Sequence, residues 1–245
     1  MNKILITGAS RGVGRTLANH FYKQGFYLIL LSRRDDFLLE DFSDLKNIDF
    51  YSVDFKHPNE LKIVLNKINM KHSFIPFIIN NAGIQSKGNF GEYSWEEFEE
   101  DLNINVRAPF EIINFLLPNL KKNDFGRIIN ITSGAPLNCS QGFSRYSSTK
   151  ALLNTLTVTI SNELSDNYDI KINLMSPGPV KTEMSPNANL NPKICIPTVE
   201  YLLNQSKNEP GGKFYWLGYE IPITPKLDGV DWNLGKATIA YKKII

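Results

Sequence analysis

The chain alternates between short apolar runs and longer segments in which apolar residues recur every three or four positions. The apolar runs are rich in β-branched and aliphatic residues and lie at 3–7, 27–32, 48–53, 76–80, 127–132, 170–175 and 213–217. Because these runs are almost continuously apolar, they predict strands buried on both faces, as in a parallel sheet. Helical spacing is clear at 13–24, 94–118 and 145–165.

The ends of these predicted helices carry local signals. Gly25 follows the first helix at the position where a left-handed residue commonly ends a helix. Ser94 and Glu97 have the spacing of a capping box at the start of the second. The third carries an apolar stripe of Leu152, Leu153, Leu156, Ile160 and Leu164. The stripe alone leaves open whether this helix faces the sheet or another chain.

This alternation predicts an α/β fold, with a doubly wound parallel sheet of about seven strands in a Rossmann-type, three-layer α/β/α arrangement. A length of 245 residues fits a single domain spanning 1–245. The segment at about 184–212 is rich in Asn and Pro around its start and is expected to be an irregular loop near the substrate. The last segment, about 224–245, is expected to be a C-terminal extension.

Composition narrows the class of protein. The 27 basic and 25 acidic residues give a net charge of +2, which argues against nucleic acid as a main partner. The two cysteines, Cys139 and Cys195, have no paired spacing, which favours a reducing compartment without a disulfide framework or a metal site. The apolar run at the amino terminus is too short for a signal peptide, and no stretch approaches a membrane span. We therefore expect a cytoplasmic protein with no membrane partner.

A glycine-rich motif, "TGASRGVG" at 7–14, follows the first predicted strand. Gly8 permits a sharp turn, Gly12 lets the backbone approach a phosphate, and Gly14 lets the following helix pack closely. The helix N-terminus then offers free N–H groups and a partial positive charge to a pyrophosphate. Glycines also collect in purely structural turns, but the position between a strand and a helix favours dinucleotide binding.

The second strand ends at Ser32, followed by Arg33 and Arg34. In a dinucleotide-binding fold, this strand end faces the adenosine ribose, where an acidic residue suits NAD and an arginine suits the 2′-phosphate of NADP. Arg11 in the glycine loop is a second cation within reach of such a phosphate. The alternative is a pair of solvated arginines, partly neutralised by the two aspartates that follow. The pattern favours NADP(H) over NAD(H).

Tyr146 and Lys150 lie four positions apart, one turn of a helix. Hydride transfer to a carbonyl leaves an oxygen that needs a proton, and a free tyrosine, with a pKa of about 10, is a poor base for the reverse reaction. A cation about 4 Å away would favour the phenolate by about 4 kcal/mol before desolvation, so Lys150 is expected to lower the pKa of Tyr146. Ser133 ends a strand at the ligand-binding edge, where its hydroxyl can donate to a substrate oxygen. Separately, each residue also fits an ordinary helix-surface or turn position.

Six motifs occur together in one order. They are "TGASRGVG", "NNAG" at 80–83, Asn105 within "NINV", Ser133 within "ITS", "YSSTK" at 146–150 and "PGPVKT" at 177–182. Their order, with the tyrosine 13 positions after the serine, resembles the classical short-chain dehydrogenase/reductase family. The resemblance covers residues 1–184 well and extends more loosely to about 218.

The resemblance implies an NADP-dependent oxidoreductase that acts on the CH–OH group of donors and transfers hydride between NADPH and a carbonyl or alcohol. A ketone, aldehyde or 3-oxoacyl-type compound is the expected substrate. The resemblance implies that Tyr146 is the acid/base and that Lys150 binds the nicotinamide ribose and lowers the pKa of the tyrosine. It also implies that Ser133 orients the substrate and that Asn105 supports a proton relay. The family also forms homodimers or homotetramers, in which helices such as 94–118 and 145–165 pair across subunits.

The resemblance also implies a cofactor site, without a metal. Its residues are Gly8, Ser10, Arg11, Gly12, Val13, Gly14, Ser32, Arg33, Asp54, Asn81, Ala82, Gly83, Tyr146, Lys150, Pro177, Gly178, Val180 and Thr182. Two of them have simpler readings, Asp54 as a helix cap and Pro177 as part of a turn. A partly apolar substrate pocket is expected from Gly134, Pro136, Leu137, Cys139, Phe143 and Met184.

The chain departs from the family near its end. It has "GGKFYWLGYEIPI" at 211–223 where reductases of acyl-carrier-protein substrates close with a "DGG"-like turn, which argues against that specificity. The alternatives for Tyr215, Trp216 and Tyr219 are burial by packing and contact with another subunit, and packing is the expectation. The alternative function is a catalytically silent dinucleotide-binding regulator or scaffold. The complete set of Ser133, Tyr146, Lys150 and Asn105 argues against it, because a pure binder has no need of the tyrosine.

Overall fold

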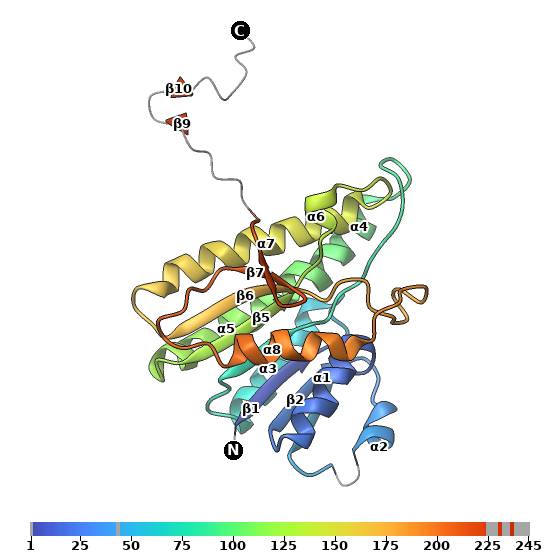
Figure 1. Cartoon of the computed structure of the whole chain (residues 1–245). Coiled ribbons are helices and arrows are strands. Elements are labelled where there is room, and N and C mark those ends of the chain that lie inside the picture. Colours follow the sequence, from blue (N-terminus) through green and yellow to red (C-terminus); the bar gives the residue numbers. More distant parts are fainter. Residues whose placement is uncertain (1, 43–44, 224–229, 232–235, 238–245) are drawn as a thin grey trace.

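An eight-stranded sheet forms the centre of the computed structural model, which describes residues 2–42, 45–223, 230–231 and 236–237 (Figure 1). The strand order is β3-β2-β1-β4-β5-β6-β7-β8. The strands are β1 (Lys3–Thr7), β2 (Tyr27–Ser32), β3 (Ile48–Ser52), β4 (Phe77–Asn80), β5 (Gly126–Ile131), β6 (Ile170–Ser176), β7 (Phe214–Trp216) and β8 (Tyr219–Ile221). Neighbours from β3 to β7 pair in parallel, and β8 pairs antiparallel with β7. The predicted doubly wound α/β fold is confirmed.

Helices cover both faces of this sheet (Figure 1). They are α1 (Gly12–Lys23), α2 (Phe37–Asp41), α3 (Pro58–Lys71), α4 (Trp95–Leu102), the π-helix η1 (Asn103–Arg107), α5 (Ala108–Lys122), α6 (Ala135–Asn138), α7 (Ser144–Ser165), the 3₁₀-helix η2 (Pro192–Cys195) and α8 (Ile196–Leu203). Apolar residues of α1 and α8 belong to one core cluster, and those of α3, α5 and α7 belong to the other. The sheet and the helices on its two faces therefore form three layers.

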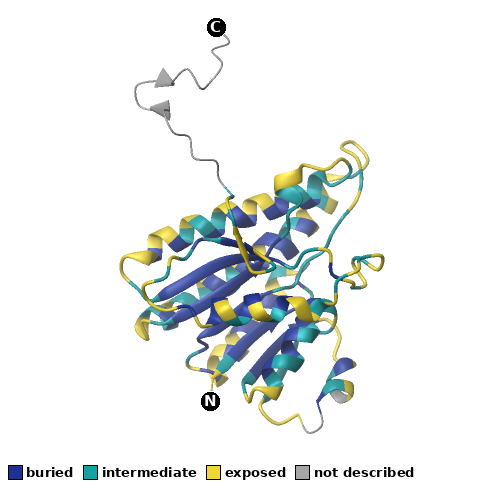
Figure 2. Cartoon of the chain, in the orientation of Figure 1, coloured by how far each residue is buried: buried dark blue, intermediate teal, exposed yellow. Residues whose placement is uncertain are grey.

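The pleat of the strands explains why their sequences are continuously apolar. Ile4 and Ile6 of β1 point into the core beneath α1 and α8, whereas Leu5 between them points into the core beneath α3 and α5. Successive side chains of a strand face opposite sides, so a strand covered on both faces needs apolar residues throughout. Figure 2 shows the sheet as the most deeply buried part of the chain.

The predicted signals at helix ends are confirmed. Gly25, just past α1, has φ 80°, which is the left-handed conformation. At the start of α4, the Glu97 backbone N–H donates to Ser94 Oγ at 3.3 Å, and the Ser94 N–H donates to the Glu97 carboxylate at 2.8 Å. The single helix predicted at 94–118 is instead α4, η1 and α5 in succession, because the middle turn of the rod is a π-helix.

The apolar stripe predicted along α7 splits between environments. Leu153 and Leu164 are buried, whereas Leu152 is 48% exposed. Apart from these two leucines, the buried residues of α7 are Tyr146, Thr149, Lys150, Asn154, Thr157 and Ser161, so its inward face is largely polar. Hydrogen bonds to the sheet make this burial possible, as when Thr132 Oγ1 of the segment after β5 donates to Asn154 Oδ1 at 2.6 Å. The apolar stripe, which left open whether this helix faces the sheet or another chain, therefore lies only partly against the sheet.

The segment at 184–212 is more ordered than its composition predicted. It contains η2 and α8, and α8 buries Val199, Leu202 and Leu203 in the core. The prediction of an irregular loop was therefore wrong for 192–203, because tertiary packing stabilises a helix that is too short for a clear periodic pattern.

The end of the sheet also differs from the prediction of about seven strands. Strand β8 returns from β7 through Leu217 and Gly218, which have φ values of 47° and 84°. Two consecutive residues with positive φ form a tight hairpin turn, and a leucine in that place is not a usual signal for one. Tyr215 is buried as predicted, but Trp216 and Tyr219 are exposed, so packing does not explain them. Within the extension predicted at 224–245, which lies mostly outside the described residues, β9 (Val230–Asp231) pairs with β10 (Lys236–Ala237).

Candidate active site

The glycine loop joins β1 to α1 at the carboxyl edge of the sheet. Gly8 and Gly12 have φ values of 65° and 54°, which side chains disfavour. A Cβ on Gly14 would lie 2.3 Å from the Gly8 carbonyl oxygen, so this glycine serves close packing of helix and loop, as predicted. Helix α1 has neither a side-chain cap nor an acidic residue in its first turn, so its N–H groups and dipole suit an anionic group.

Thr7 ties this loop to the next strand, a role that the sequence analysis missed. The backbone N–H groups of Asn81 and Ala82 donate to Thr7 Oγ1 at 3.0 and 2.9 Å. Asn81 Nδ2 donates in turn to the carbonyl oxygens of Thr7 and Gly8. The ends of β1 and β4 are thereby held together. A hydroxyl residue at the last position of a strand was the available signal.

The arginines after β2 differ in how strongly they are engaged. Arg34 pairs with Asp36 at 2.5 Å, as the alternative reading of solvated, neutralised arginines expected. The Arg33 side chain is 59% exposed and has only a 3.7 Å ion pair with Asp54. Of these two cations, Arg33 is the more available to an incoming phosphate.

Two further side chains complete the environment of this strand end. Ser32 is buried and its Oγ donates to the Arg34 carbonyl at 2.7 Å, so it fixes the turn. Asp54 accepts from the Lys56 backbone N–H at 3.0 Å, whereas the N-cap position of α3 belongs to His57. The reading of Asp54 as a cap of the following helix was therefore wrong.

A loop from the other half of the sheet lies against the glycine loop. A Cβ on Gly12 would lie 3.0 Å from Thr182 Cγ2. Arg11 and Glu183 form an ion pair at 2.5 Å between the same two loops. The loop bonds to itself as well, since the Lys181 N–H donates to the Leu190 carbonyl at 2.7 Å. The predicted residues of "PGPVKT" therefore do face those of "TGASRGVG".

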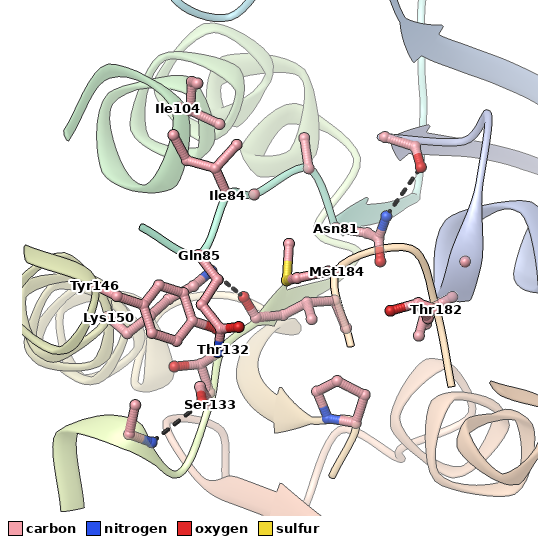
Figure 3. A pocket seen from close by; sticks show the side chains of 18 of the residues that line it. Asn81, Ile84, Gln85, Ile104, Thr132, Ser133, Tyr146, Lys150, Thr182 and Met184 are labelled. Carbon is pink, nitrogen blue, oxygen red and sulfur yellow. Dashed lines mark hydrogen bonds between the residues drawn. The ribbon is translucent and has the colours of Figure 1, made fainter. Parts of the chain in front are cut away.

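Ser133, Tyr146 and Lys150 meet between the end of β5 and the start of α7 (Figure 3). Ser133 Oγ accepts the Ala135 backbone N–H at 3.1 Å, and its hydroxyl lies near Tyr146 in the same cavity. Lys150 Nζ donates to the carbonyl oxygen of Ile131 at 2.9 Å and lies 6.0 Å from the centroid of the Tyr146 ring. The lysine is therefore beside the tyrosine without a direct hydrogen bond to its hydroxyl.

Burial dominates the electrostatics of this pair. Burial raises the pKa of Tyr146, against a smaller opposing effect of the nearby Ser133 hydroxyl. It also lowers the pKa of Lys150 to about 8, because the ammonium has a carbonyl rather than a carboxylate as its partner. The expectation that Lys150 lowers the pKa of Tyr146 does not hold in this arrangement. A phenol that keeps its proton is suited to act as an acid.

Asn105 lies behind the other three residues, fully buried in η1. Its Nδ2 donates to the Ile84 carbonyl and to Thr149 Oγ1, each at 3.0 Å, and its Oδ1 accepts the Ile84 N–H at 2.9 Å. A Cβ on Gly83 would lie 3.1 Å from Asn105 Oδ1 and 3.4 Å from Lys150 Nζ. Gly83 thus keeps an approach open between the asparagine and the lysine.

One cavity, with a volume of about 1060 Å³, brings the predicted site together. Every predicted catalytic and cofactor-binding residue lines it except Gly14 and Asn105, which pack behind its wall. Of the predicted substrate-pocket residues, Pro136 and Cys139 lie outside it, although both are in the described part of the chain. Lining residues that the sequence analysis did not assign to the site include Ile84, Gln85, Ser86, Ile221 and Trp216, the last of which was expected to be buried by packing. Figure 3 shows Gln85 in the same view as Tyr146 and Ser133.

The described residues contain neither a cluster of metal-ligating side chains nor a membrane-spanning helix. No group of three or more His, Cys, Asp or Glu residues in it could hold a metal ion. Within the same residues, no helix combines the length and the apolar character needed to cross a bilayer. Cys139 is exposed and Cys195 is buried, and both are free thiols.

The family model described as short chain dehydrogenase matches residues 2–193. The chain belongs to this family. Among curated relatives of this short-chain dehydrogenase, the 3-oxoacyl-[acyl-carrier-protein] reductase FabG of Thermotoga maritima is 27% identical over 185 residues, which cover 74% of this chain and 75% of the relative.

Solved structures show the same fold for this short-chain dehydrogenase. The structure of ElxO with NADP bound is 26% identical, with a TM-score of 0.79, over 88% of this chain and 96% of that one. A 4-hydroxyisoleucine dehydrogenase complexed with NADH has a TM-score of 0.82 at 20% identity, over 88% of this chain and 96% of that one. A nucleotide cofactor is thus common to these relatives, whereas its type varies.

Proposed function

We propose that the protein is an NADP(H)-dependent oxidoreductase that interconverts a carbonyl compound and its alcohol. One observation carries the proposal. Ser133, Tyr146 and Lys150 line the same cavity as Arg11 and Arg33, so a proton donor and two phosphate-binding cations share one continuous site. The NADP bound to ElxO supports this choice of cofactor.

The residues present fit a dinucleotide. The uncapped N-terminus of α1 would hold the pyrophosphate, because its N–H groups and dipole favour negative charge. Arg33, helped by Arg11, would hold a 2′-phosphate by charge-assisted hydrogen bonds. Asn81, Ala82 and Gly83, with the residues of 177–182, line the cavity between that end and Tyr146. When bound, NADPH supplies the hydride.

The protein's own side chains would handle the proton. Tyr146, whose pKa is raised by burial, holds its proton and would donate it to the oxygen that becomes the alcohol. Ser133, which lines the same cavity as Tyr146, would orient that oxygen and stabilise its developing charge. Lys150 Nζ adds positive charge behind the tyrosine. Asn105 does not line the cavity, so its part in a proton relay would be indirect.

The proposed substrate is a ketone, an aldehyde or a 3-oxoacyl-type compound. The name of the Thermotoga maritima reductase supports the last class. The cavity wall combines apolar residues such as Leu137, Phe143 and Met184 with the polar Gln85 and Ser86. Such a lining suits a small molecule with both an apolar part and oxygen atoms near the reacting carbon.

A turnover screen tests this function. NADPH oxidation would be followed by absorbance with a panel of carbonyl compounds, for the wild type and for Tyr146→Phe. We expect the variant to bind NADPH normally and to lose at least about 100-fold in kcat, in line with the loss of a general acid. Equal activity in both proteins would contradict the mechanism. The alternative, a silent dinucleotide-binding regulator, predicts tight cofactor binding and no turnover with either protein.

We also propose that the protein works as a homodimer or homotetramer in the cytoplasm. An apolar depression lies on α4, α5 and α7, with Trp95 64% exposed and Phe110 41% exposed beside Leu156. Pairing of these helices across subunits would cover it. Sedimentation of the wild type and of Phe110→Glu tests this, since a charge in the interface would leave monomers. Monomeric wild type would contradict it.

A further inference from the structure

Thr149 is a fully buried residue inside "YSSTK" that the proposed chemistry has not used. Its Oγ1 accepts a hydrogen bond from Asn105 Nδ2 at 3.0 Å and donates one to the Tyr146 carbonyl oxygen at 2.9 Å. One hydroxyl therefore links the asparagine of η1 to the helical turn that carries the tyrosine. Its location excludes contact with a substrate, because it does not line the cavity.

The orientation of the Asn105 amide depends on few contacts. Two hydrogen bonds join it to the backbone of Ile84, one through Oδ1 and one through Nδ2. Thr149 Oγ1 accepts from the same nitrogen and is its side-chain partner. Without that hydroxyl, one N–H of a fully buried amide would lack an acceptor, and its desolvation would no longer be offset by a hydrogen bond. The amide would then favour other orientations.

The direction in which Asn105 points matters for Lys150. Asn105 Oδ1 and Lys150 Nζ both lie within 3.4 Å of the position that a Cβ on Gly83 would occupy. The π-helical turn η1 places Asn105 at this point, inside a rod that is α-helical on either side. Turns of this kind occur frequently at functional sites. Thr149 therefore acts on an amide whose oxygen lies near the Lys150 ammonium.

We propose that Thr149 is a positioning residue for the reaction, which holds the Asn105 amide toward Lys150 and couples it to the Tyr146 turn. The proposal rests on the proposed oxidoreductase function. It assigns the hydroxyl of Thr149, rather than its size, as the feature that matters. Thr149→Ser keeps the hydroxyl, whereas Thr149→Val keeps the shape and leaves Asn105 Nδ2 with an unmet hydrogen bond.

The chain contains a matched control two turns further along α7. Thr157 is also fully buried, and its Oγ1 donates to the Leu153 carbonyl at 2.7 Å. It accepts from Asn130 Nδ2 at 2.8 Å, so it makes the same two kinds of bond as Thr149. Neither Thr157 nor Asn130 lines the cavity. Thr157→Val therefore reproduces the structural cost of losing a buried threonine hydroxyl, away from the reacting groups.

Steady-state kinetics with NADPH and a carbonyl substrate distinguishes a positioning role of Thr149 from a purely structural one. We expect Thr149→Val to lower kcat by about tenfold, the rate equivalent of one lost buried hydrogen bond, with KM for NADPH unchanged within about twofold. Thr149→Ser and Thr157→Val should keep kcat within about twofold of the wild type. A kcat for Thr149→Val no lower than that for Thr157→Val would overturn the proposal.

A second measurement does not depend on turnover. NMR hydrogen exchange of the Asn105 side-chain amide should be at least about tenfold faster in Thr149→Val than in the wild type, and unchanged in Thr157→Val. Unchanged exchange in Thr149→Val would overturn the positioning role even if the enzyme is active. A wild type without any turnover would overturn the proposed function, while the exchange rates would still decide whether Thr149 holds Asn105.

Discussion

The Lys150 ammonium donates a hydrogen bond to the carbonyl oxygen of Ile131 at 2.9 Å, and the lysine is buried at the wall of the cavity. A carbonyl offers only a partial negative charge, so it compensates the buried ammonium less than a carboxylate would. Burial therefore lowers the pKa of Lys150 to about 8. The same burial raises the pKa of Tyr146, so both groups favour their neutral forms relative to solution.

The burial of the Lys150 ammonium predicts that Lys150→Met changes the free energy of unfolding in a pH-dependent way. The pKa of Lys150 is about 8 in the folded protein and about 10.4 in the unfolded chain. Between these pH values the unfolded chain binds more protons than the folded protein. The destabilising effect of Lys150 is therefore full below pH 8 and fades as pH rises. The stability advantage of Lys150→Met over the wild type should shrink by about 2 kcal/mol from pH 7 to pH 10. Urea unfolding of both proteins at the two pH values measures it. A difference that stays constant with pH would show that Lys150 keeps an ordinary pKa.

The position of Arg33 predicts that the protein prefers NADPH to NADH. Its guanidinium has only a 3.7 Å ion pair with Asp54, so it is free to bind a 2′-phosphate. Arg33→Asp should weaken NADPH binding by about tenfold or more and leave NADH binding within about twofold, because NADH lacks that phosphate. Titration calorimetry with both cofactors measures the ratio. Arg34→Asp serves as the comparison and should have the smaller effect, since Asp36 already engages Arg34. An unchanged NADPH/NADH ratio in Arg33→Asp would refute the assignment.

Glu183 predicts a competing effect at Arg11. The two side chains form an ion pair at 2.5 Å, and both are substantially exposed. Release of Arg11 in Glu183→Gln should strengthen the binding of adenosine 2′,5′-bisphosphate by about two- to fivefold, which is the range of an exposed ion pair. Binding of 5′-AMP, which lacks the 2′-phosphate, is the internal control and should not change. Equal gains for the two nucleotides would show that Arg11 does not discriminate between them.

Gly14 predicts a steric limit in the glycine loop. A Cβ there would lie 2.3 Å from the Gly8 carbonyl oxygen, a backbone atom that cannot move easily, and 2.4 Å from the side-chain atom Asn81 Nδ2. Gly14→Ala should lower the free energy of unfolding by about 1–3 kcal/mol, the usual cost of overpacking. Gly134→Ala is the control, because its Cβ would meet nothing nearer than Asn138 Nδ2 at 3.7 Å. Thermal unfolding of both variants tests the difference, and similar melting temperatures would contradict it.

Some features of the site were not predictable from sequence. The polar inward face of α7 opposes the rule that apolar residues mark the buried side, because Asn154 and Thr157 satisfy their hydrogen bonds on the sheet. Helix α8 is a similar case, since its stability comes from packing in the core rather than from a long periodic pattern. The turn at Leu217 lacks the residues that usually signal a hairpin.

Local rules explain what the sequence by itself determined. Apolar runs identified the strands that are covered on both faces, and Gly8, Gly12 and Gly14 marked the strand–turn–helix junction, because these features depend on neighbours along the chain. The order and spacing of six motifs, among them those with Ser133, Tyr146 and Lys150, were enough to propose the chemistry through the family resemblance that they carry.

Only the tertiary structure decided how those groups are tuned. Whether a cation lowers the pKa of Tyr146 depends on how far Lys150 lies from it and on the Ile131 carbonyl that binds the ammonium. It also depends on how deeply the tyrosine is buried. The bonds of Thr149 to Asn105 and of Arg11 to Glu183 join residues 44 and 172 positions apart. Desolvation and contacts of this kind are properties of the packed chain, so no local pattern records them.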